Sequence, residues 1–334
     1  MSSTNGETKA NATGDILIQR KTTTSADVLQ REVKTSTHEI LLNDLENILK
    51  NIETRSNGQK RWKCLKYLGG TQGTSAIVLA KDMQYGLVAL KFVPTPPTSK
   101  SYGRFVRELK FLARIGQHQN VAVHKSDKPM RSVDRSLAVG ILEFVPGKNV
   151  NDMIKDMKTM PQHLTVQIGI DVARGLVHVH KKGLAHKDIK CANIMCGPEG
   201  FKIVDFGIAA IEDEDVKNEL GRDSTLVTKT KQNHSMSGTM HYMSPEQYGY
   251  KYEESSSSED SSGEQEETKE QTTSVPGVDK RTDIWSLGVV MYHCVTGKLP
   301  FGRNKHGFGQ ISNAVINSKG CPKKHINIKK AHQM

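Results

Sequence analysis

The most constraining feature of the sequence is a series of polar motifs in a fixed order along its second half. The motifs are HKDIKCAN at residues 186–193, VDFG at 204–207, MSPE at 243–246 and DIWSLG at 283–288. All four follow a stretch at 164–181 in which apolar residues such as Val172, Leu176 and Val179 recur at helical spacing. These motifs therefore belong to a mostly helical half of the chain.

The region that precedes these motifs has a different pattern of apolar residues, typical of short strands. Three short runs of β-type residues lie at 76–80, 86–93 and 137–144, and a helical stretch lies between them at 103–115. This pattern predicts a small sheet with one helix. Together the two regions predict an α+β fold with a β-rich part followed by a helical part.

The composition bounds the size and the partners of the protein. The 334 residues are 36% hydrophobic, which is enough for one large domain or two small ones. The net charge is +11, but an acidic, Ser-rich segment at 253–275 carries −7, so the remainder carries +18. A basic body suits polyanionic ligands such as nucleotide phosphates. Nucleic acid is disfavoured as a partner because no aromatic-rich basic motif accompanies the charge.

The ends and the acidic segment have low-complexity composition. Residues 1–35 are polar and predicted to be disordered, the acidic insert 253–275 is predicted to be a solvated loop, and 319–334 form a basic tail. Between them, Ser36 and Glu39 form a capping box that opens an amphipathic helix near 37–53. Its apolar stripe has two interpretations: packing on the adjacent domain, or docking to a partner.

The sequence also indicates a location. The N-terminus lacks the apolar run of a secretory signal, and no run approaches the roughly 18 apolar residues of a membrane span. The five cysteines show neither metal-ligand nor disulfide-framework spacing. We therefore expect no membrane association, a reducing compartment and a cytoplasmic protein, with a nuclear location as the alternative.

The polar motifs suit phosphoryl transfer, which requires held phosphates, a placed metal ion and an oriented hydroxyl. Asp188 would accept or orient the proton of the incoming hydroxyl, and Lys190 would neutralise charge on the transferring group. Asn193 and Asp205 would ligate the Mg²⁺ that bridges the phosphates of ATP. Chance occurrence of all these motifs in this order is negligible.

Two weaker features precede these motifs. A glycine-rich turn at 68–78 could bring backbone N–H groups close to phosphate oxygens, although an ordinary hairpin turn is equally compatible with it. Lys91 ends the run VALK, and Glu108 follows 17 residues later on the predicted helix. A Lys held by a carboxylate from another element can bridge two phosphates, whereas a Lys on a strand is more often only a surface charge.

These motifs identify a resemblance. Over about residues 62–312 the chain resembles the eukaryotic-type serine/threonine protein kinases. The resemblance implies a two-lobed fold, with a five-stranded N-lobe at 61–145, a helical C-lobe at 146–318 and ATP between them. It leaves open whether the last helices of the family's C-lobe are present.

The resemblance assigns roles to residues that match its motifs. Lys91 and Glu108 look like the ion pair of the active state, Asp188 like the catalytic base, and Asn193 and Asp205 like the metal ligands. The nucleotide-binding positions that it implies are Leu68, Gly69, Gly70, Gly73, Ile77, Ala89, Lys91, Glu143, Val145 and Met195, with Glu143 to Val145 as the hinge. Leu112, His186 and Phe206 resemble an aligning stack, and Asp283 resembles a residue that ties down the catalytic loop.

The expected function is therefore ATP- and Mg²⁺-dependent phosphorylation of Ser or Thr in a protein substrate. The rival is a truncated, catalytically impaired member that acts as a scaffold or binding module. The main support for the rival is that the sequence has no obvious counterpart of the family's last C-lobe helices, whereas all the metal- and proton-handling positions are filled. Two further departures from the family pattern are that Gln72 and Ser75 stand where glycines are expected and that Lys187 replaces the usual Arg. A small-molecule kinase is disfavoured because residues 238–246 resemble a segment that positions a peptide.

Overall fold

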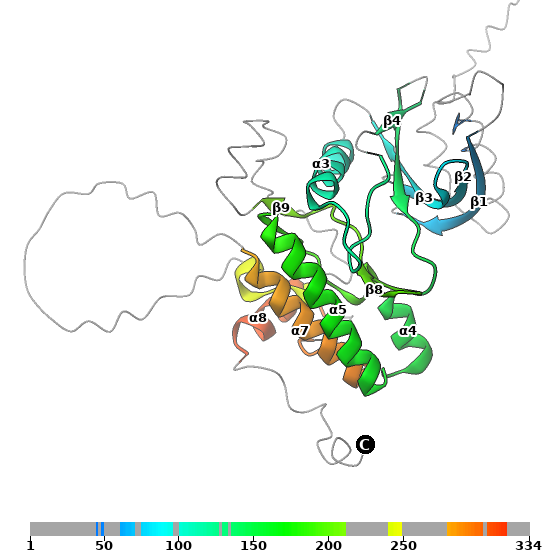
Figure 1. Cartoon of the computed structure of the whole chain (residues 1–334). Helices are drawn as coiled ribbons and strands as arrows, with labels where there is room; N and C mark the ends of the chain where they lie inside the picture. The colour runs from blue at the N-terminus through cyan, green and yellow to red at the C-terminus, as the bar shows by residue number, and fades with distance from the viewer. Residues whose placement is uncertain are drawn as a thin grey trace, which may run out of the picture.

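The computed structural model of the chain describes residues 45, 48–49, 61–70, 75–95, 100–126, 129–132, 135–211, 240–248, 279–302 and 306–318. Several predictions concern residues outside these ranges: the polar N-terminus, most of the helix near 37–53, Gly73, the acidic insert 253–275 and the tail 319–334. The described part forms the predicted two-lobed α+β fold, with a β-rich N-lobe above a helical C-lobe (Figure 1).

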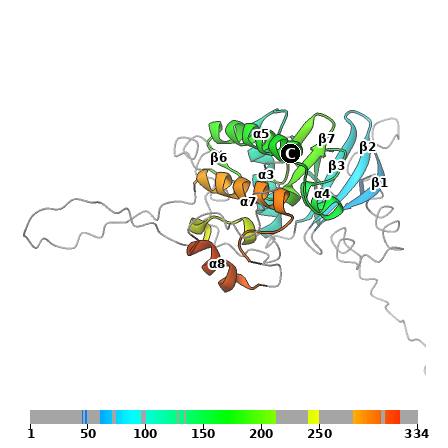
Figure 2. The same ribbon diagram turned by 90° about the horizontal axis from the view of Figure 1, so that it is seen from below.

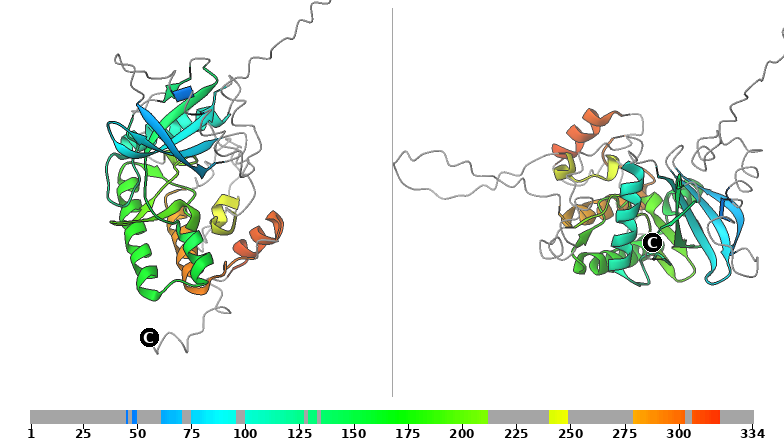
Figure 3. Two further views of the ribbon diagram at one scale, coloured as in Figure 1. Left: turned by 90° about the vertical axis from the view of Figure 1, so that its right-hand side faces the viewer. Right: turned by 90° about the horizontal axis from the view of Figure 1, so that it is seen from above.

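The N-lobe is built on one antiparallel sheet of five strands in the order β1-β2-β3-β5-β4. The strands are β1 (Trp62–Gly69), β2 (Ala76–Asp82), β3 (Gly86–Pro94), β4 (Met130–Arg131) and β5 (Leu137–Glu143). Asp82 stabilises the tight turn from β2 to β3, because its Oδ1 accepts hydrogen bonds from the backbone N–H groups of Gln84 and Tyr85. Figure 3 shows the sheet as one layer over the helical lobe.

Helical residues pack on both faces of the sheet. On one face, Phe105 and Leu109 of α3 (Lys100–Ile115) pack against Val93 and Ala138. On the other face, the helical residues Leu45 and Leu49 are buried with Trp62 and the apolar residues of β2, β3 and β5. These two leucines therefore pack on the adjacent domain, as the first interpretation of the amphipathic helix predicted.

The C-lobe is helical apart from short strand pairs. Its helices are α4 (Val150–Met157), α5 (Gln162–Lys181), α7 (Arg281–Thr296) and α8 (Phe308–Ile316), with 3₁₀ turns at η1 (Cys191–Asn193), η2 (Met240–Tyr242) and η3 (Pro245–Tyr248). Helices α5 and α7 lie side by side in Figures 1 and 2. Asn149 caps α4 by accepting a hydrogen bond from the N–H of Asp152, and Gly297 ends α7 in the left-handed conformation.

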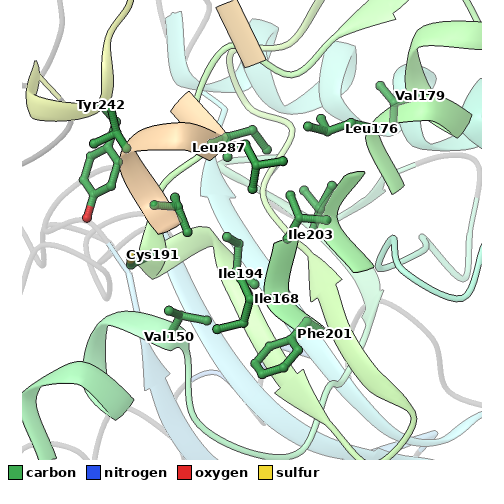
Figure 4. Close-up of a cluster of buried hydrophobic side chains, with 14 of the residues drawn as sticks. Val150, Ile168, Leu176, Val179, Cys191, Ile194, Phe201, Ile203, Tyr242 and Leu287 are labelled. Carbon is green, nitrogen blue, oxygen red and sulfur yellow. The ribbon is translucent and has the colours of Figure 1, made fainter. Parts of the chain in front are cut away.

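Two strand pairs position the polar motifs between the lobes. They are β7 (Ile194–Gly197) with β8 (Gly200–Ile203), and β6 (Leu184–Ala185) with β9 (Ala210–Ile211). The loop at 186–193 connects β6 to β7, and the segment that follows β8 carries residues 204–207. Their apolar side chains are part of the C-lobe core, where Cys191 and Ile194 lie near Ile168 of α5 and Leu287 of α7 (Figure 4).

The core therefore fixes the loop that bears the polar motifs against the two central helices. Burial of these apolar side chains is the main stabilising contribution, on the order of 1.5–3 kcal/mol for each large side chain. Among the helices that the structure describes, none combines the length and apolar character required to cross a lipid bilayer.

Candidate active site

Three separate elements bring Lys91, Glu108 and Asp205 together. Lys91 lies on β3, Glu108 on α3 and Asp205 on the segment after β8. The Nζ of Lys91 lies 2.7 Å from Oε2 of Glu108 and 3.7 Å from Oδ1 of Asp205. Glu108 is buried, whereas the side chain of Asp205 is 49% exposed. The ammonium of Lys91 is thus held between a buried carboxylate and one that is open to a ligand.

Burial and mutual attraction set the charges in this group. Burial acts to lower the pKa of Lys91, but the carboxylates of Glu108 and Asp205 outweigh it and hold this pKa above its ordinary value. Burial raises the pKa of Glu108, and Lys91 opposes that shift. At Asp205, partial loss of solvent acts to raise the pKa, but nearby cations, Lys91 first among them, hold it below its usual range. Asp205 is therefore an anion at neutral pH.

Asp188 lies in the loop between β6 and β7 with one oxygen bonded and the other unpartnered. Its Oδ2 accepts hydrogen bonds from Nζ of Lys190 at 2.7 Å and from Nδ2 of Asn193 at 3.0 Å. Its Oδ1 is buried and has no hydrogen-bond partner in the described part of the chain. A buried acceptor without a partner is costly, so it suits a group that binds a donor during function.

The pKa of Asp188 is raised. Burial is the main cause, and the charge and hydrogen bond of Lys190 oppose it. A carboxylate with a raised pKa is a stronger base than an ordinary aspartate, and Asp188 remains available to accept a proton.

The backbone of this loop is held by Asp283, the fully buried third residue of α7. Its two carboxylate oxygens accept hydrogen bonds from the N–H groups of His186 at 2.9 Å and Lys187 at 2.8 Å. His180, near the end of α5, lies 2.8 Å from the same carboxylate through Nε2. The predicted tie between Asp283 and the loop is therefore confirmed.

The turn at Asp205-Phe206-Gly207 is joined to the same loop. Phe206 is buried, and its ring lies edge-on to that of His186 with centroids 4.5 Å apart. Leu112 of α3 belongs to the same apolar cluster as Phe206. The His186–Phe206 contact of the stack implied by the family resemblance is thus present, and Leu112 of α3, the helix that carries Glu108, lies in the same apolar core.

The residues expected to surround adenine lie on both lobes. Ala89 and Val145 are buried, whereas Ile77 and Met195 are half-buried. On the sheet, Ala89 is opposite Leu142, the residue before the hinge. Met195 is on β7 of the other lobe, where it pairs with the residue before α4. The arrangement gives apolar side chains from both lobes, as a sandwiched base requires.

The glycine-rich segment begins at the end of β1 and is described only in part. Leu68 is 42% exposed, and Gly69 and Gly70 both have φ values in the glycine-favoured region, at 144° and 148°. A Cβ on Gly70 would lie 2.2 Å from the carbonyl oxygen of Ser75, so this position requires glycine. Gly73 lies outside the described residues.

The side chains assigned to metal binding have the chemistry that Mg²⁺ prefers. Asp205 presents a half-exposed carboxylate, and Asn193 uses its amide nitrogen for both of its side-chain contacts, with the carbonyl and Oδ2 of Asp188. That leaves the amide oxygen of Asn193 for a cation. No group of three or more His, Cys, Asp or Glu that could hold a metal occurs among the described residues. The site thus fits an ion that takes its other ligands from phosphates and water.

One interaction at the hinge was missed from the sequence. The carboxylate of Glu143 lies 2.6 Å from Nζ of Lys202 on β8 and accepts a hydrogen bond from the N–H of Val123. Glu143 can therefore contact a nucleotide only through its backbone. A single Lys in a short strand gives no sequence signal of such a pairing, because alternating polar residues are ordinary in strands.

Among the described residues, the site combines a cation between two carboxylates, a basic oxygen of Asp188 without a hydrogen-bond partner, and a second cation beside it. Lys91 can hold phosphates and Asp205 can hold a metal ion. Asp188 can accept a hydrogen bond from an incoming hydroxyl, and Lys190 can neutralise negative charge beside it. This is the arrangement required for in-line phosphoryl transfer.

Comparison with known proteins agrees with this arrangement. Residues 62–261 match the family model described as protein kinase domain. A probable serine/threonine-protein kinase of Clostridium perfringens is 34% identical over 190 residues, which cover 56% of this chain and 22% of that protein. Serine/threonine-protein kinase PknB of Mycobacterium leprae is 31% identical over 237 residues, covering 70% and 32%. Mouse dual specificity protein kinase TTK is 27% identical over 254 residues, covering 74% and 26%.

The aligned part of the chain thus spans about a third or less of the length of these relatives. The family model covers more than half of the chain, from the first strand of the sheet through both polar motifs between the lobes. The chain belongs to the protein kinase family.

Proposed function

We propose that this protein is an ATP-dependent serine/threonine kinase that transfers the γ-phosphoryl group to a hydroxyl of a protein substrate. The observation that carries the proposal is the position of Lys91, 2.7 Å from Glu108 and 3.7 Å from Asp205. These residues come from β3, α3 and the segment after β8, and a structural role alone does not require that they meet.

On the nucleotide side, Lys91 would contact phosphate oxygens while Glu108 holds its position. Asp205 and Asn193 would bind Mg²⁺, which neutralises charge on the phosphates when bound. Backbone groups beside Gly70 would approach the phosphates, and the hinge backbone from Glu143 to Val145 would face the base. Ile77, Ala89 and Met195 would enclose the base with apolar surface.

On the acceptor side, the hydroxyl of the substrate would donate to Oδ1 of Asp188. As its oxygen forms a bond to the γ-phosphorus, the bond from that phosphorus to the bridging oxygen breaks and ADP leaves. The hydroxyl proton passes to Asp188, and Lys190 stabilises negative charge on the transferring group. The bonded Oδ2 keeps the carboxylate oriented so that Oδ1 receives the proton.

The preference for Ser and Thr is supported by the names of the bacterial relatives. The substrate is a protein in this proposal because residues 243–246 match the end of the segment that positions a peptide in the family. Cys191, Cys196 and Cys294 are thiols, in agreement with a reducing compartment, and we propose a cytoplasmic or nuclear location. A partner at the N-terminal helix would have to use residues other than the buried Leu45 and Leu49.

The test is transfer of label from γ-labelled ATP to a generic basic protein in the presence of Mg²⁺, followed by phosphoamino acid analysis. We expect phosphoserine or phosphothreonine, and no label when the metal is chelated. Label on tyrosine alone would contradict the proposed specificity. Absence of transfer from a folded protein would favour the scaffold alternative.

A further inference from the structure

The backbone of Lys187, the residue before Asp188, has an unusual conformation. Its φ is 65°, in the left-handed region that non-glycine residues adopt only at a cost. Its N–H donates to Oδ1 of Asp283 at 2.8 Å, and its carbonyl oxygen accepts a hydrogen bond from Nε2 of Gln247 at 3.1 Å. Both backbone polar groups of this strained residue are therefore held by side chains of other elements.

The amide of Gln247 is itself oriented by its neighbours. Its Oε1 accepts hydrogen bonds from the N–H of Ser244 at 3.0 Å and from the hydroxyl of Thr282 at 2.8 Å. The Ser244 hydroxyl also contacts Thr282 at 2.6 Å and Oε1 at 3.3 Å. Because these groups bond to Oε1 of Gln247, the other side of the amide, its Nε2, points at the carbonyl of Lys187. Ser244 and Thr282 are fully buried, and Gln247 is nearly so.

These contacts join three parts of the chain that are distant in sequence. Gln247 lies in η3, directly after the MSPE motif, and Thr282 precedes Asp283 at the start of α7. Gln247 donates to the carbonyl of Lys187, in the peptide unit that leads into Asp188, and Asp283, next to Thr282, accepts from the N–H of Lys187. The end of the segment that begins at Asp205 is thereby connected to the loop that carries the proposed base.

We propose that Gln247 is a positioning residue for phosphoryl transfer. It holds the carbonyl of Lys187 while Asp283 holds the N–H, and the two together direct the carboxylate of Asp188 at the substrate hydroxyl. This inference rests on the proposed kinase activity. It also gives a function to the turn at residues 244–247. When this turn is formed, Gln247 and Asp283 together align Asp188 through the backbone of Lys187. When the turn is lost, the contact from Gln247 is lost and only that from Asp283 remains.

A purely structural role makes a different prediction from a positioning role. If Gln247 only fills space, Gln247→Met, which has a similar volume and no polar group, should cost as much as Gln247→Glu. If it positions Lys187, Gln247→Glu should cost more. That variant keeps the oxygen that accepts hydrogen bonds from Ser244 and Thr282. Its second carboxylate oxygen, however, would face the carbonyl oxygen of Lys187, and the two acceptors would repel each other.

The experiment measures kcat and KM for Mg-ATP in the full chain, with Gln162→Glu at the exposed far end of α5 as the matched control. We expect Gln247→Glu to lower kcat about tenfold or more at pH 7.5, with KM for Mg-ATP changed by less than about twofold. Gln247→Met should lower kcat less, and the control should behave as wild type.

A pH series adds a readout that packing does not affect. As the pH falls, the carboxyl of Gln247→Glu takes up a proton and regains a donor for Lys187, so its kcat relative to wild type should rise. Gln247→Met should show no such rise. The inference is overturned if both variants keep kcat within about twofold of wild type, or if both lose the same amount at every pH.

Two further measurements keep the inference testable. If thermal unfolding shows that Gln247→Glu does not fold, Thr282→Val, which removes one donor to Oε1, should lower kcat by a few-fold, and an unchanged kcat overturns the inference. If wild type transfers no phosphate, the proposed function fails separately. Amide hydrogen exchange of residues 184–190 then tests the role of Gln247 without activity. Faster exchange of these amides in both Gln247 variants than in Gln162→Glu supports the role, and unchanged exchange contradicts it.

Discussion

The two loops that would meet the substrates are built in opposite ways. The loop from β6 to β7 is fixed by side chains: Asp283 and Gln247 hold the backbone of Lys187, while Lys190 and Asn193 hold Asp188. The turn at the end of β1 instead presents its backbone, with an exposed Leu68 and with a glycine at position 70 whose replacement by a larger residue would force the turn to shift. The first loop would act through placed side chains and the second through backbone N–H groups.

This difference explains why one loop has a sharp sequence motif and the other a degenerate one. A loop held by side chains needs particular residues at particular positions, so HKDIKCAN stands out. A turn that acts through its backbone needs only the glycines that its conformation demands, so Gln72 and Ser75 can replace glycines elsewhere. We therefore expect changes in the first loop to affect kcat and changes in the second to affect KM for Mg-ATP.

The largest effect is expected from Asp188→Asn. The amide has the shape of the carboxylate but cannot accept the hydroxyl proton, so kcat should fall by roughly 10²–10⁴. KM for Mg-ATP should change little, because Asp188 faces the acceptor. Steady-state kinetics with a peptide substrate provide the check. A variant that retains a tenth of the wild-type kcat would show that Asp188 is not the base.

Lys91→Met should lower transfer by roughly 10²–10³, because the phosphates lose their fixed cation. Burial already raises the pKa of Glu108, so this residue can take up a proton when its partner is removed, and the fold should persist. Phosphate transfer and thermal unfolding measure the two effects. Transfer close to the wild-type rate at saturating Mg-ATP would exclude Lys91 from the site.

Gly70→Ala tests the other half of the comparison. The new methyl group would lie 2.2 Å from the carbonyl oxygen of Ser75 at a φ of 148°, so the turn must shift. We expect KM for Mg-ATP to rise about tenfold with kcat nearly unchanged, from strain on the order of 1–3 kcal/mol. Gly69→Ala is the matched control: it shares the glycine-favoured φ, at 144°, but its Cβ would meet no atom of the described residues within 4 Å, so it should cost less. Equal effects of the two would contradict this account of the turn.

A smaller effect is expected from pH. Asp188 must be deprotonated to accept a proton, and its pKa is raised, chiefly by burial. The rate should therefore fall as the pH is lowered through that raised pKa, at a higher pH than an ordinary aspartate would titrate. A pH–rate profile measures this, with circular dichroism over the same range to exclude unfolding. A rate that stays flat until ordinary aspartates titrate would contradict the raised pKa.

The smallest effect is expected from deletion of residues 254–273 in the acidic insert. This segment contains no apolar residue that could pack against either loop, so transfer should stay within about tenfold of wild type. Turnover of a peptide substrate by the deletion variant is the measurement. A larger loss would show that the insert contacts one of the two loops.

The sequence predicted the parts of the fold and site that depend on residue type at fixed spacing. The pairing of Lys91 with Glu108 and the tie from Asp283 to the loop follow from motifs, and the structure contains both. The strands β2, β3 and β5 were also visible as β-type runs. By contrast, β4 has only two residues, and β1 alternates buried and exposed positions poorly, so neither gave a periodic signal.

Contacts made by polar side chains across the fold could not be predicted in this way. Gln247 and Lys202 act on residues 60 and 59 positions away, and neither lies in a motif whose spacing reveals its partner. The amphipathic helix was ambiguous for a related reason: an apolar stripe shows that something covers it, but not what. Only the burial of Leu45 and Leu49 against the sheet decides this for those two residues.

The central claim is that the site transfers phosphate and does so through Asp205 and its neighbours. The most direct test compares the rate of label transfer from γ-labelled ATP by wild type, Asp205→Asn and Asp156→Asn. Asp156 is an exposed residue of α4 paired with Lys148, so its variant controls for loss of a carboxylate elsewhere. Wild type and Asp156→Asn should transfer phosphate at similar rates, and Asp205→Asn should be inactive while remaining folded. Equal transfer by all three, or none by folded wild type, would contradict the claim.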